Sequence, residues 1–567
     1  MVEVTSILPP RFKRAEAFNR DRLALGGALE GADRITRETA LWRPSLRSPD
    51  EVINRAKVLA DARGVDSARN TGFISGAVAR HKDSIIGSQY RLNARPDWKY
   101  LKTINKAFDE VWADEFQQEV EAWFNLLAES EACWLDAQGM NTLTGQLRLA
   151  IGIFLMTGEV IATVEWLRAR IRPCNTALQL VAGNRLSNPN GVSDTRYLRG
   201  GVERDDQGQP IAYNFRMGDP LSPYPDSMGY IWRRVPYAKP WGRQQVIHII
   251  EQQLPDQSRG ISDMVSALKN MHMTKRFQEV TLQSAVIQAT YAAAIESELS
   301  GEVISAVLGA GNADGKMDVQ KAIQDVAGGY LTTLTAYLGD ATSVRVDGAQ
   351  IPHLFPGTKL NMMPAKTAGG VGTSFEESLM RHTAAALNLS YEEFSRDFSK
   401  TNYSSGRLAM GVSAQAMSSR KRHVADRYAN SVYALALEER MAAGLVPLPS
   451  GGKVTRDVFY EVLAKEAICR ASWIGSGAGQ IDELKETQAA MLRIGAGLTT
   501  WEKESSRLGL DWREVFAQRA REEAYAAELG LEFDLAATKP LGKSDTAGAA
   551  SDPVVDTPPG SNTGGQE

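Results

Sequence analysis

Two long runs of helical periodicity dominate the pattern of apolar and polar positions along the chain. The first follows Ser262 and meets no proline or glycine before Gly301, and the second follows Ser404 and Ser405 and ends at Gly444. At about 1.5 Å per residue, each run predicts a rod on the order of 55 Å long, far longer than an ordinary helix. The serines can supply N-cap oxygens. Rods of this length need packing partners along them.

The remaining pattern predicts an α+β chain that is predominantly helical. Further helices are expected at residues 48–64, 72–86, 102–127, 141–157, 374–387, 454–471, 481–494 and 500–529. Between these, alternating apolar and polar positions from residue 159 to residue 251 indicate strands, and Asp205 to Gly208 provide the turn of a hairpin. A helical part therefore precedes a β-rich part.

A polar segment with three aromatic residues leads into the second rod. Residues 394–406 carry hydroxyl, amide and charged groups around Phe394, Phe398 and Tyr403. A solvated linker has no need of three aromatic side chains. From these residues alone, two interpretations stay open: an Ω-loop packed on its own aromatics, and a surface that touches something polar and extended.

Composition narrows the class of protein. The chain of 567 residues is too long for one core, and its net charge is −4, from 64 Lys and Arg against 68 Asp and Glu. This balance argues against gripping nucleic acid along a basic stripe, but not against a channel through which DNA slides. Cys133, Cys174 and Cys469 form no CxxC pair, so we expect reduced thiols. No apolar run reaches the roughly 18 residues of a membrane helix, and no signal peptide is evident.

Patterns for catalysis are missing from the sequence. The segment AGNADGKM at 310–317 approaches a phosphate-binding loop, but Met317 stands where a hydroxyl would hold magnesium. The glycine-rich GSGAG at 475–479 lacks a preceding strand, and the six histidines form neither an HExxH motif nor a close pair. We therefore expect no catalytic residue, no metal site and no cofactor, and a protein that is not an enzyme.

Four sequence blocks resemble one known family in the same order. They are ARNTGFISGAVARHKDSIIGSQYRLNARPD at 68–97, VIHIIEQQLPDQSRGISDMVSAL at 246–268, SFEESLMRHTAAALNLSYEEFSRDFS followed by NYSSGRLA at 374–409, and CRASWIGSGAGQIDELKETQAAMLRIGAGLTT at 469–500. Together they resemble the lambda-type portal proteins of tailed bacteriophages, the head-tail connectors. The resemblance covers roughly residues 50 to 530, and none of the blocks is a catalytic signature.

The resemblance implies a division of the chain into the regions of a portal fold. The expected regions are an N-terminal arm (1–45), a wing (46–260), a first stem helix (261–300), a clip-containing α/β insertion (301–373), a second stem helix (374–390), a tunnel loop (391–406), a long helix with helical wing and crown (407–537) and a disordered tail (538–567).

The resemblance also implies a function and a set of partners. Such a chain forms a homododecameric ring at one vertex of the capsid, made in the host cytoplasm and retained in the virion. The ring would dock the terminase large subunit during genome packaging, contact the major capsid protein or scaffold, and later bind neck or adaptor proteins. Double-stranded DNA would pass through it without sequence recognition, on entry and on ejection. Two other classes stay open: a minor head or adaptor protein without an axial channel, and an ATP- or DNA-processing enzyme.

Candidate site residues follow from the resemblance and from side-chain chemistry. Cationic and amide groups touch phosphate without reading bases, so a ring of loops would supply many weak contacts. The DNA-proximal candidates in the tunnel loop are Phe394, Arg396, Phe398, Lys400, Asn402 and Tyr403. On the first stem helix, possible channel-lining residues are Lys269, Lys275 and Arg276. Arg420, Lys421 and Arg422 suit a solvated helix face or an inter-subunit contact.

Overall fold

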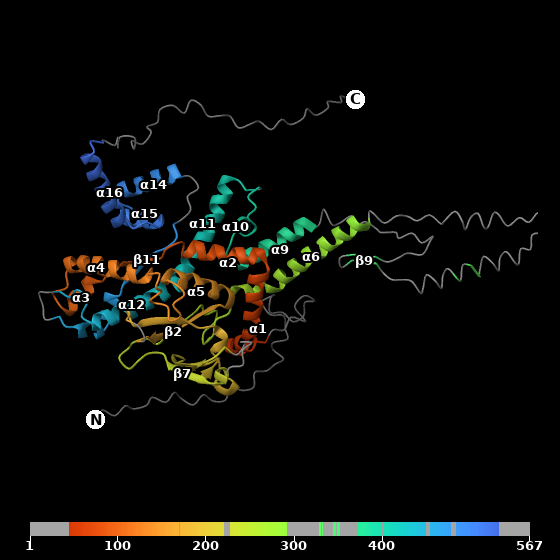
Figure 1. The fold of residues 1–567 in the computed structure, drawn as a ribbon, viewed down its shortest axis with the longest axis horizontal. Coiled ribbons are helices and arrows are strands. Elements are labelled where there is room, and N and C mark those ends of the chain that lie inside the picture. Colours follow the sequence, from red (N-terminus) through yellow and green to blue (C-terminus); the bar gives the residue numbers. More distant parts are fainter. Residues whose placement is uncertain are drawn as a thin grey trace, which may run out of the picture.

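The structure is a computed structural model that describes most of the chain between residues 45 and 531. The described ranges are 45–168, 171–219, 227–291, 372–399, 401–449, 454–477 and 483–531, with short pieces at 328–329, 332, 344–346 and 349–351. They form a largely helical fold with several small sheets, as the sequence predicts (Figure 1). Predictions for the N-terminal arm, most of the clip insertion, the first rod beyond residue 291 and the C-terminal tail lie outside these ranges.

Helices of the N-terminal half surround one large core. They are α1 (Pro49–Asn70), α2 (Gly72–Ile85), α3 (Trp98–Ile104), α4 (Glu110–Ala128) and α5 (Leu143–Thr157). In α5, the Thr142 hydroxyl accepts the N–H of Gly145 as an N-cap, and Gly158 ends the helix with φ of 78°. A side chain at Gly158 would collide with the backbone of Ile261, so this glycine lets the end of α5 touch the segment that leads into the first rod.

The strands form antiparallel sheets. Strands β2 (Glu159–Trp166), β3 (Thr176–Leu180) and β8 (Val246–Ile250) form one sheet in the order β3-β2-β8. Strands β4 (Leu198–Arg199), β5 (Val202–Arg204), β6 (Pro210–Arg216) and β7 (Trp232–Pro236) form a second in chain order. The predicted hairpin turn joins β5 to β6, with the N–H of Asp205 donating to the carbonyl of Gln209 at 2.9 Å. A further hairpin pairs β9 (Val344–Val346) with β10 (Ala349–Ile351).

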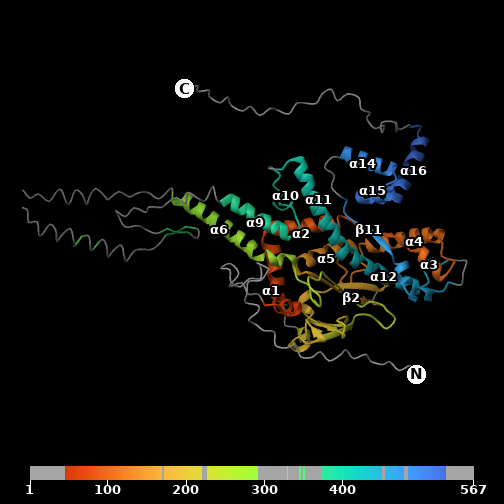
Figure 2. The same ribbon diagram turned by 180° about the vertical axis from the view of Figure 1, so that it is seen from behind.

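Two helices project side by side from this body. Helix α6 (Leu268–Tyr291) follows a 3₁₀ turn (Asp263–Ser266), and α9 (Gly372–Ala386) returns beside it (Figures 1 and 2). The second rod begins next to them, after the short helix α10 (Tyr391–Ser395), and consists of α11 (Tyr403–Arg420), a π-helical segment (Lys421–Asp426) and α12 (Arg427–Ala442). Its lower half is buried in the body, whereas α11 rises out of it.

The C-terminal part returns to the body before forming a small helical layer. After a 3₁₀ turn (Arg456–Tyr460) and α13 (Ala464–Ile468), strand β11 (Ala471–Ile474) pairs antiparallel with β1 (Arg91–Ala94), although some 380 residues separate them. Helices α14 (Glu483–Gly495), α15 (Trp501–Arg507) and α16 (Trp512–Glu528) then lie on the side of the body that also carries α10 and α11 (Figure 1).

Several predicted helix boundaries are wrong, because a tertiary contact or a capping residue determines where each of these helices begins or ends. Helix α1 runs through Gly64, which is needed because a side chain there would strike the carbonyl of Met156. The helix predicted at 102–127 is two helices, since Asp97 and Asp109 cap α3 and α4 separately. The second rod starts at the N-cap Asn402 rather than at a serine.

The C-terminal helices are also shorter than predicted. The segment 454–471 is not one helix, because Leu463 adopts φ of 57° and the chain then joins β1 as a strand. The helix predicted at 500–529 is divided at Gly509, where φ is 78°, and Asp511 caps its second part. In both cases a single left-handed residue ends the run that periodicity favours.

An aromatic cluster joins distant parts of the chain in the core. Trp473 of β11 stacks on Tyr90 with ring centroids 5.6 Å apart, and both Phe124 of α4 and Tyr433 of α12 meet it edge-on. The four rings are almost completely buried. The C-terminal strand is thereby fixed between helices from both halves of the chain.

A half-buried carboxylate on α4 makes the stability of this region depend on pH. Burial raises the pKa of Glu121 to about 7 from its ordinary value of 4.5, and the hydrogen bonds from Gln117 and the N–H of Ala94 oppose this shift. The pKa of Glu121 is higher in the folded chain than in the unfolded chain, so protonated Glu121 favours the folded state. This contribution to the free energy of unfolding is complete below pH 4.5 and is lost as the pH rises through 7.

We therefore expect Glu121→Gln to be more stable than the wild type at pH 8, by at most about 3 kcal/mol, and close to it at pH 4.5. Thermal unfolding midpoints at the two pH values test this. The exposed Glu461→Gln serves as the control and should have an unfolding midpoint close to that of the wild type at both pH values. A difference between Glu121→Gln and wild type that is the same at both pH values would contradict the assignment.

Candidate functional site

The two projecting helices contact each other along one seam. Phe277 of α6 meets Phe375 of α9 edge-on with centroids 6.0 Å apart. The side-chain amide of Asn270 lies 3.0 Å from Nδ1 of His382. Elsewhere on α6, apolar side chains remain exposed, including Leu282, which is 67% exposed. A single copy of the chain therefore leaves part of this helix pair uncovered.

The cations predicted for the first stem helix lie on α6. Lys269 and Arg276 are exposed, and because they are seven residues apart they share one face of the helix. Lys275 is half-buried and lies on another face. Two of the three candidates are thus presented together.

The segment before the second rod is anchored at its start. The Ser390 hydroxyl accepts the N–H of Glu393 and so caps α10, and the Glu393 carboxylate receives Arg80 of α2 at 3.0 Å. Phe394 is buried and stacks on Phe73 of α2, with centroids 5.7 Å apart. Phe394 therefore belongs to the anchor of the loop rather than to its exposed surface.

The tip of the loop is exposed and held by local hydrogen bonds. Arg396 ends α10 in the left-handed conformation, with φ of 57°, and Phe398 is 58% exposed. Asn402 accepts the N–H of Ser405 at 2.8 Å, so its amide oxygen caps α11. The backbone of Tyr403 begins α11. Lys400 and the side chain of Tyr403 lie outside the described residues.

Arg420 connects the elements that meet at the base of the projecting helices. Its buried guanidinium pairs with Asp263, in the turn that leads into α6, and lies over the ring of Phe154 at 5.7 Å. Beside it, the buried His81 ring of α2 contacts the carbonyl of Leu387, at the end of α9, at 3.0 Å. Burial, together with the nearby Arg420, lowers the pKa of His81 to about 3, so the ring is neutral at physiological pH. Arg420 is thus neither a solvated residue nor free for a partner.

A buried ion cluster anchors the segment that enters α6. Arg259 donates to both oxygens of Glu159, at 2.6 and 3.0 Å, and to the carbonyls of Gly183, Leu186 and Gly200. Lys57 of α1 lies 3.4 Å from the same carboxylate. Burial alone would raise the pKa of Glu159, but Arg259 and Lys57 hold it well below its usual range.

The sequence did not single out this cluster. Arg259 stands in the Arg-Gly turn of the second block, but nothing in the linear pattern pairs it with Glu159, 100 residues earlier. The available signal was Glu159, which begins an otherwise apolar strand. A buried carboxylate needs a cationic partner, so its position indicated that such a partner lies nearby in the fold. Among the described residues no group of three or more His, Cys, Asp or Glu side chains could hold a metal ion. No described helix has the length and apolar character to cross a bilayer.

The chain belongs to the lambda family of phage portal proteins: the family model "Phage portal protein, lambda family" matches residues 36–421, more than half of its length. It is similar to the portal protein of Escherichia phage N15, with 36% identity over 491 residues, 86% of this chain and 88% of that protein. It is also similar to portal protein B of Escherichia phage lambda, with 34% identity over 492 residues, 87% of this chain and 88% of that protein. The resemblance inferred from the four sequence blocks is confirmed.

Solved structures with similarity to the chain come from gene transfer agent (GTA) particles. The neck of an empty GTA particle, computed with C6 symmetry, matches 82% of this chain and 95% of that chain, with 14% identity and a TM-score of 0.36. The virion of a native GTA particle matches 76% and 98%, with 15% identity and a TM-score of 0.29. At these scores the likeness carries no further conclusion.

Proposed function

We infer that this portal protein assembles into a closed ring, with twelve copies expected, that forms a DNA channel at one capsid vertex. The observation that carries the inference is the helix pair α6 and α9. The pair projects from the body, and apolar side chains on α6 remain exposed there. Met273, Val280 and Leu282 are each at least half exposed. Side-by-side copies of the same helix pair would cover these side chains and enclose an axial space.

The regions of the chain take their roles from this arrangement. The body at 46–260 would be the wing, and α6 and α9 would be the stem. The insertion at 301–373 would contain the clip, residues 391–406 the tunnel loop, and the region to 537 the remaining wing and the crown. Docking of the terminase large subunit during packaging, and of neck or adaptor proteins afterwards, is expected at the clip. Contacts with the major capsid protein or scaffold are expected around the wing of the assembled particle.

DNA contacts are assigned to loop positions that do not anchor the loop. In the tunnel loop these are the exposed Arg396 and Phe398, with Lys400 and Tyr403 as further candidates, while Phe394 and Asn402 position the loop. On the stem, Lys269 and Arg276 are favoured over Lys275 because they share an exposed face. Such groups would touch the phosphate backbone without reading bases, which suits a duplex that must slide.

Electron microscopy of the purified protein tests the proposal directly. End-on views should show closed rings with an axial hole wide enough for duplex DNA, and side views should show a narrow stem below a wide body. Monomers or open chains under conditions that support phage assembly would overturn it. An ATPase assay on the same sample should show no activity, which would separate this function from the nucleotide-processing alternative.

A further inference from the structure

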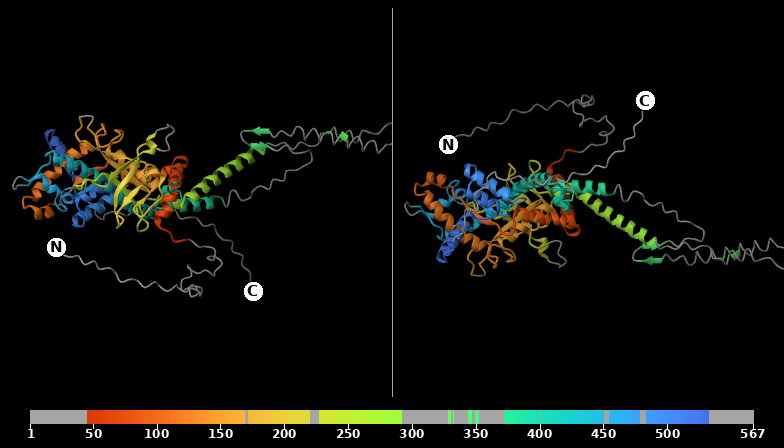
Figure 3. Two further views of the ribbon diagram at one scale, coloured as in Figure 1. Left: turned by 90° about the horizontal axis from the view of Figure 1, so that it is seen from below. Right: turned by 90° about the horizontal axis from the view of Figure 1, so that it is seen from above.

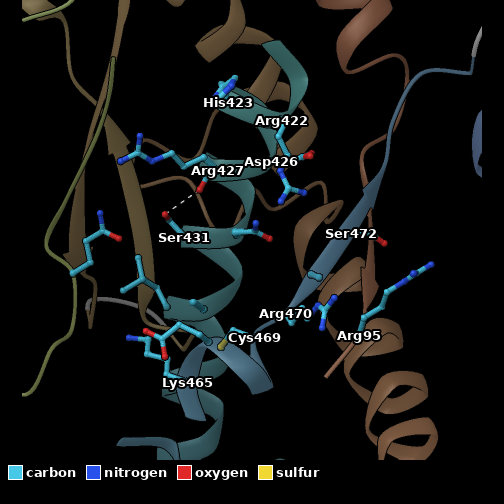
Figure 4. A pocket seen from close by; sticks show the side chains of 16 residues that line it. Arg95, Arg422, His423, Asp426, Arg427, Ser431, Lys465, Cys469, Arg470 and Ser472 are labelled. Carbon is cyan, nitrogen blue, oxygen red and sulfur yellow. Dashed lines mark hydrogen bonds between the residues drawn. The ribbon is translucent and has the colours of Figure 1, made fainter. Parts of the chain in front are cut away.

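A basic hollow of about 740 Å³ opens beside α12, away from the tunnel loop (Figure 4). It lies between α12 with the preceding π-helical segment on one side and α13 with β11 on the other. Its cationic lining residues are Arg95, Arg422, Arg427, Lys465 and Arg470, against the acidic Asp426 and Glu466. The hollow is therefore suited to negatively charged groups.

Two of these cations are not neutralised within the described part of the chain. Arg95 pairs with Glu502, Arg470 with Asp97 at 2.8 Å, and Lys465 with Glu438 at 3.1 Å. The guanidinium groups of Arg422 and Arg427, in contrast, are exposed and make no hydrogen bond or ion pair with any described residue. Asp426 cannot serve them well, because it already receives the Tyr90 hydroxyl and Lys421.

Helix α4 carries a complementary acidic face. Its exposed side bears Glu110, Asp114, Glu115 and Glu119. Asp114 pairs with Arg513, and Glu119 with Arg440, but Glu110 and Glu115 have no ion-pair partner among the described residues. Between them lies Val111, which is 66% exposed. The unpaired carboxylates make this face complementary in charge to the basic hollow.

The two surfaces are separate on one copy of the chain. On α12, Arg427 and Ser431 face the hollow, while Val432 is buried. Tyr433 of α12 meets Phe124 on the buried face of α4, with ring centroids 5.3 Å apart. The acidic side chains lie on the exposed side of α4 and do not line the hollow.

We propose that the acidic face of α4 from a second copy of this chain docks in the basic hollow beside α12, with Glu110 and Glu115 of one copy near Arg422 and Arg427 of the next. Two different surfaces with complementary charge make a heterologous contact, which closes into a ring when the rotation between copies allows it. The inference rests on the proposed ring and assigns part of its subunit interface.

Charge reversal with compensation tests this pairing. We expect R422E/R427E to lower the fraction of protein found in rings by roughly tenfold or more, because like charges then face each other across every interface. The complementary E110R/E115R should have a similar effect. Combining the four substitutions in one chain should restore assembly to at least half of the wild-type level. Native mass spectrometry and end-on electron microscopy measure the ring fraction.

Controls separate this pairing from folding defects and from other occupants. All four residues are exposed, so each variant should keep the wild-type circular dichroism, and the exposed R519E on α16 should assemble normally. Rings formed equally well by R422E/R427E would overturn the inference, whereas a wild type that forms no rings would overturn the proposed function. A third outcome is that R422E/R427E loses its rings, that adding E110R/E115R does not restore them, and that deleting residues 532–567 causes the same loss. This outcome would mean that the acidic C-terminal tail, and not α4, occupies the hollow.

Discussion

Replacing Arg259 with methionine is expected to lower the free energy of unfolding of the body by about 3–5 kcal/mol. The variant would leave the carboxylate of Glu159 buried without its main counter-charge, together with three backbone carbonyls that lose their donor. Because the cluster also fixes the segment that enters α6, the stem should lose its anchor and the ring fraction should fall. Chemical denaturation of the purified protein measures the first effect and native mass spectrometry the second.

Two further variants show whether burial of the ion pair is the cause. R259M/E159Q should be more stable than R259M alone, since the buried charge is then absent. The exposed pair of Arg233 and Glu165, 3.5 Å apart, is the matched surface case, and R233M should cost no more than about 1 kcal/mol. An effect of R259M as small as that of R233M would show that the cluster is not an anchor.

Replacing the loop residues Phe398 and Lys400 by serine is expected to leave ring assembly unchanged and to reduce the amount of packaged DNA by roughly tenfold or more. Phe398 is exposed in the single chain, so its loss removes surface rather than core. The ring would then lack one aromatic and one cationic contact per subunit next to the duplex. Protection of DNA from nuclease in assembled particles measures packaging and retention.

The control for this loop variant is an equivalent change on the far side of the body. Tyr230 and Lys239 are both exposed and lie near β7, away from α10 and α11, so Y230S/K239S should package normally. The anchor variant F394A should behave differently, with a lower unfolding midpoint, because Phe394 packs on Phe73. If the F398S/K400S variant fails to form rings, the loop belongs to the assembly interface instead.

Periodicity and local caps predicted the helices that determine the architecture. Helices α6, α9 and α2, the hairpin at Asp205 to Gly208 and most of the second rod follow from signals within a few residues of each other. The family could also be predicted from the sequence, because four short blocks resemble it in the same order along the chain. Predictions failed where a contact between residues far apart in the sequence determines the local structure. Gly64 lies against Met156 inside a helix that was expected to end there, and β11 forms a strand by pairing with β1.

The candidate site was predicted less completely than the fold. Sequence reasoning proposed the loop and the cations of α6, the helix that projects from the body in Figure 3, as candidates. It could not tell that Phe394 is turned into the core while Phe398 is exposed. The same holds for three adjacent basic residues of the second rod: Arg420 is buried against Asp263, whereas Arg422 lines the open hollow. Which of these basic residues is buried and which is exposed depends on the elements packed around the rod, and the sequence pattern does not show this.

The π-helical segment at Lys421–Asp426 lets the second rod hold one extra residue without turning α11. A π turn holds one residue more than the α turn it replaces, and one residue corresponds to about 100° of rotation about a regular helix axis. Deleting a single residue within this segment would therefore restore a regular α-helix and leave α11 and the Phe398 loop facing the same side of the subunit. Deleting a residue from a regular α-helical turn would instead swing the loop to another side, and in a ring every copy would make the same turn at once.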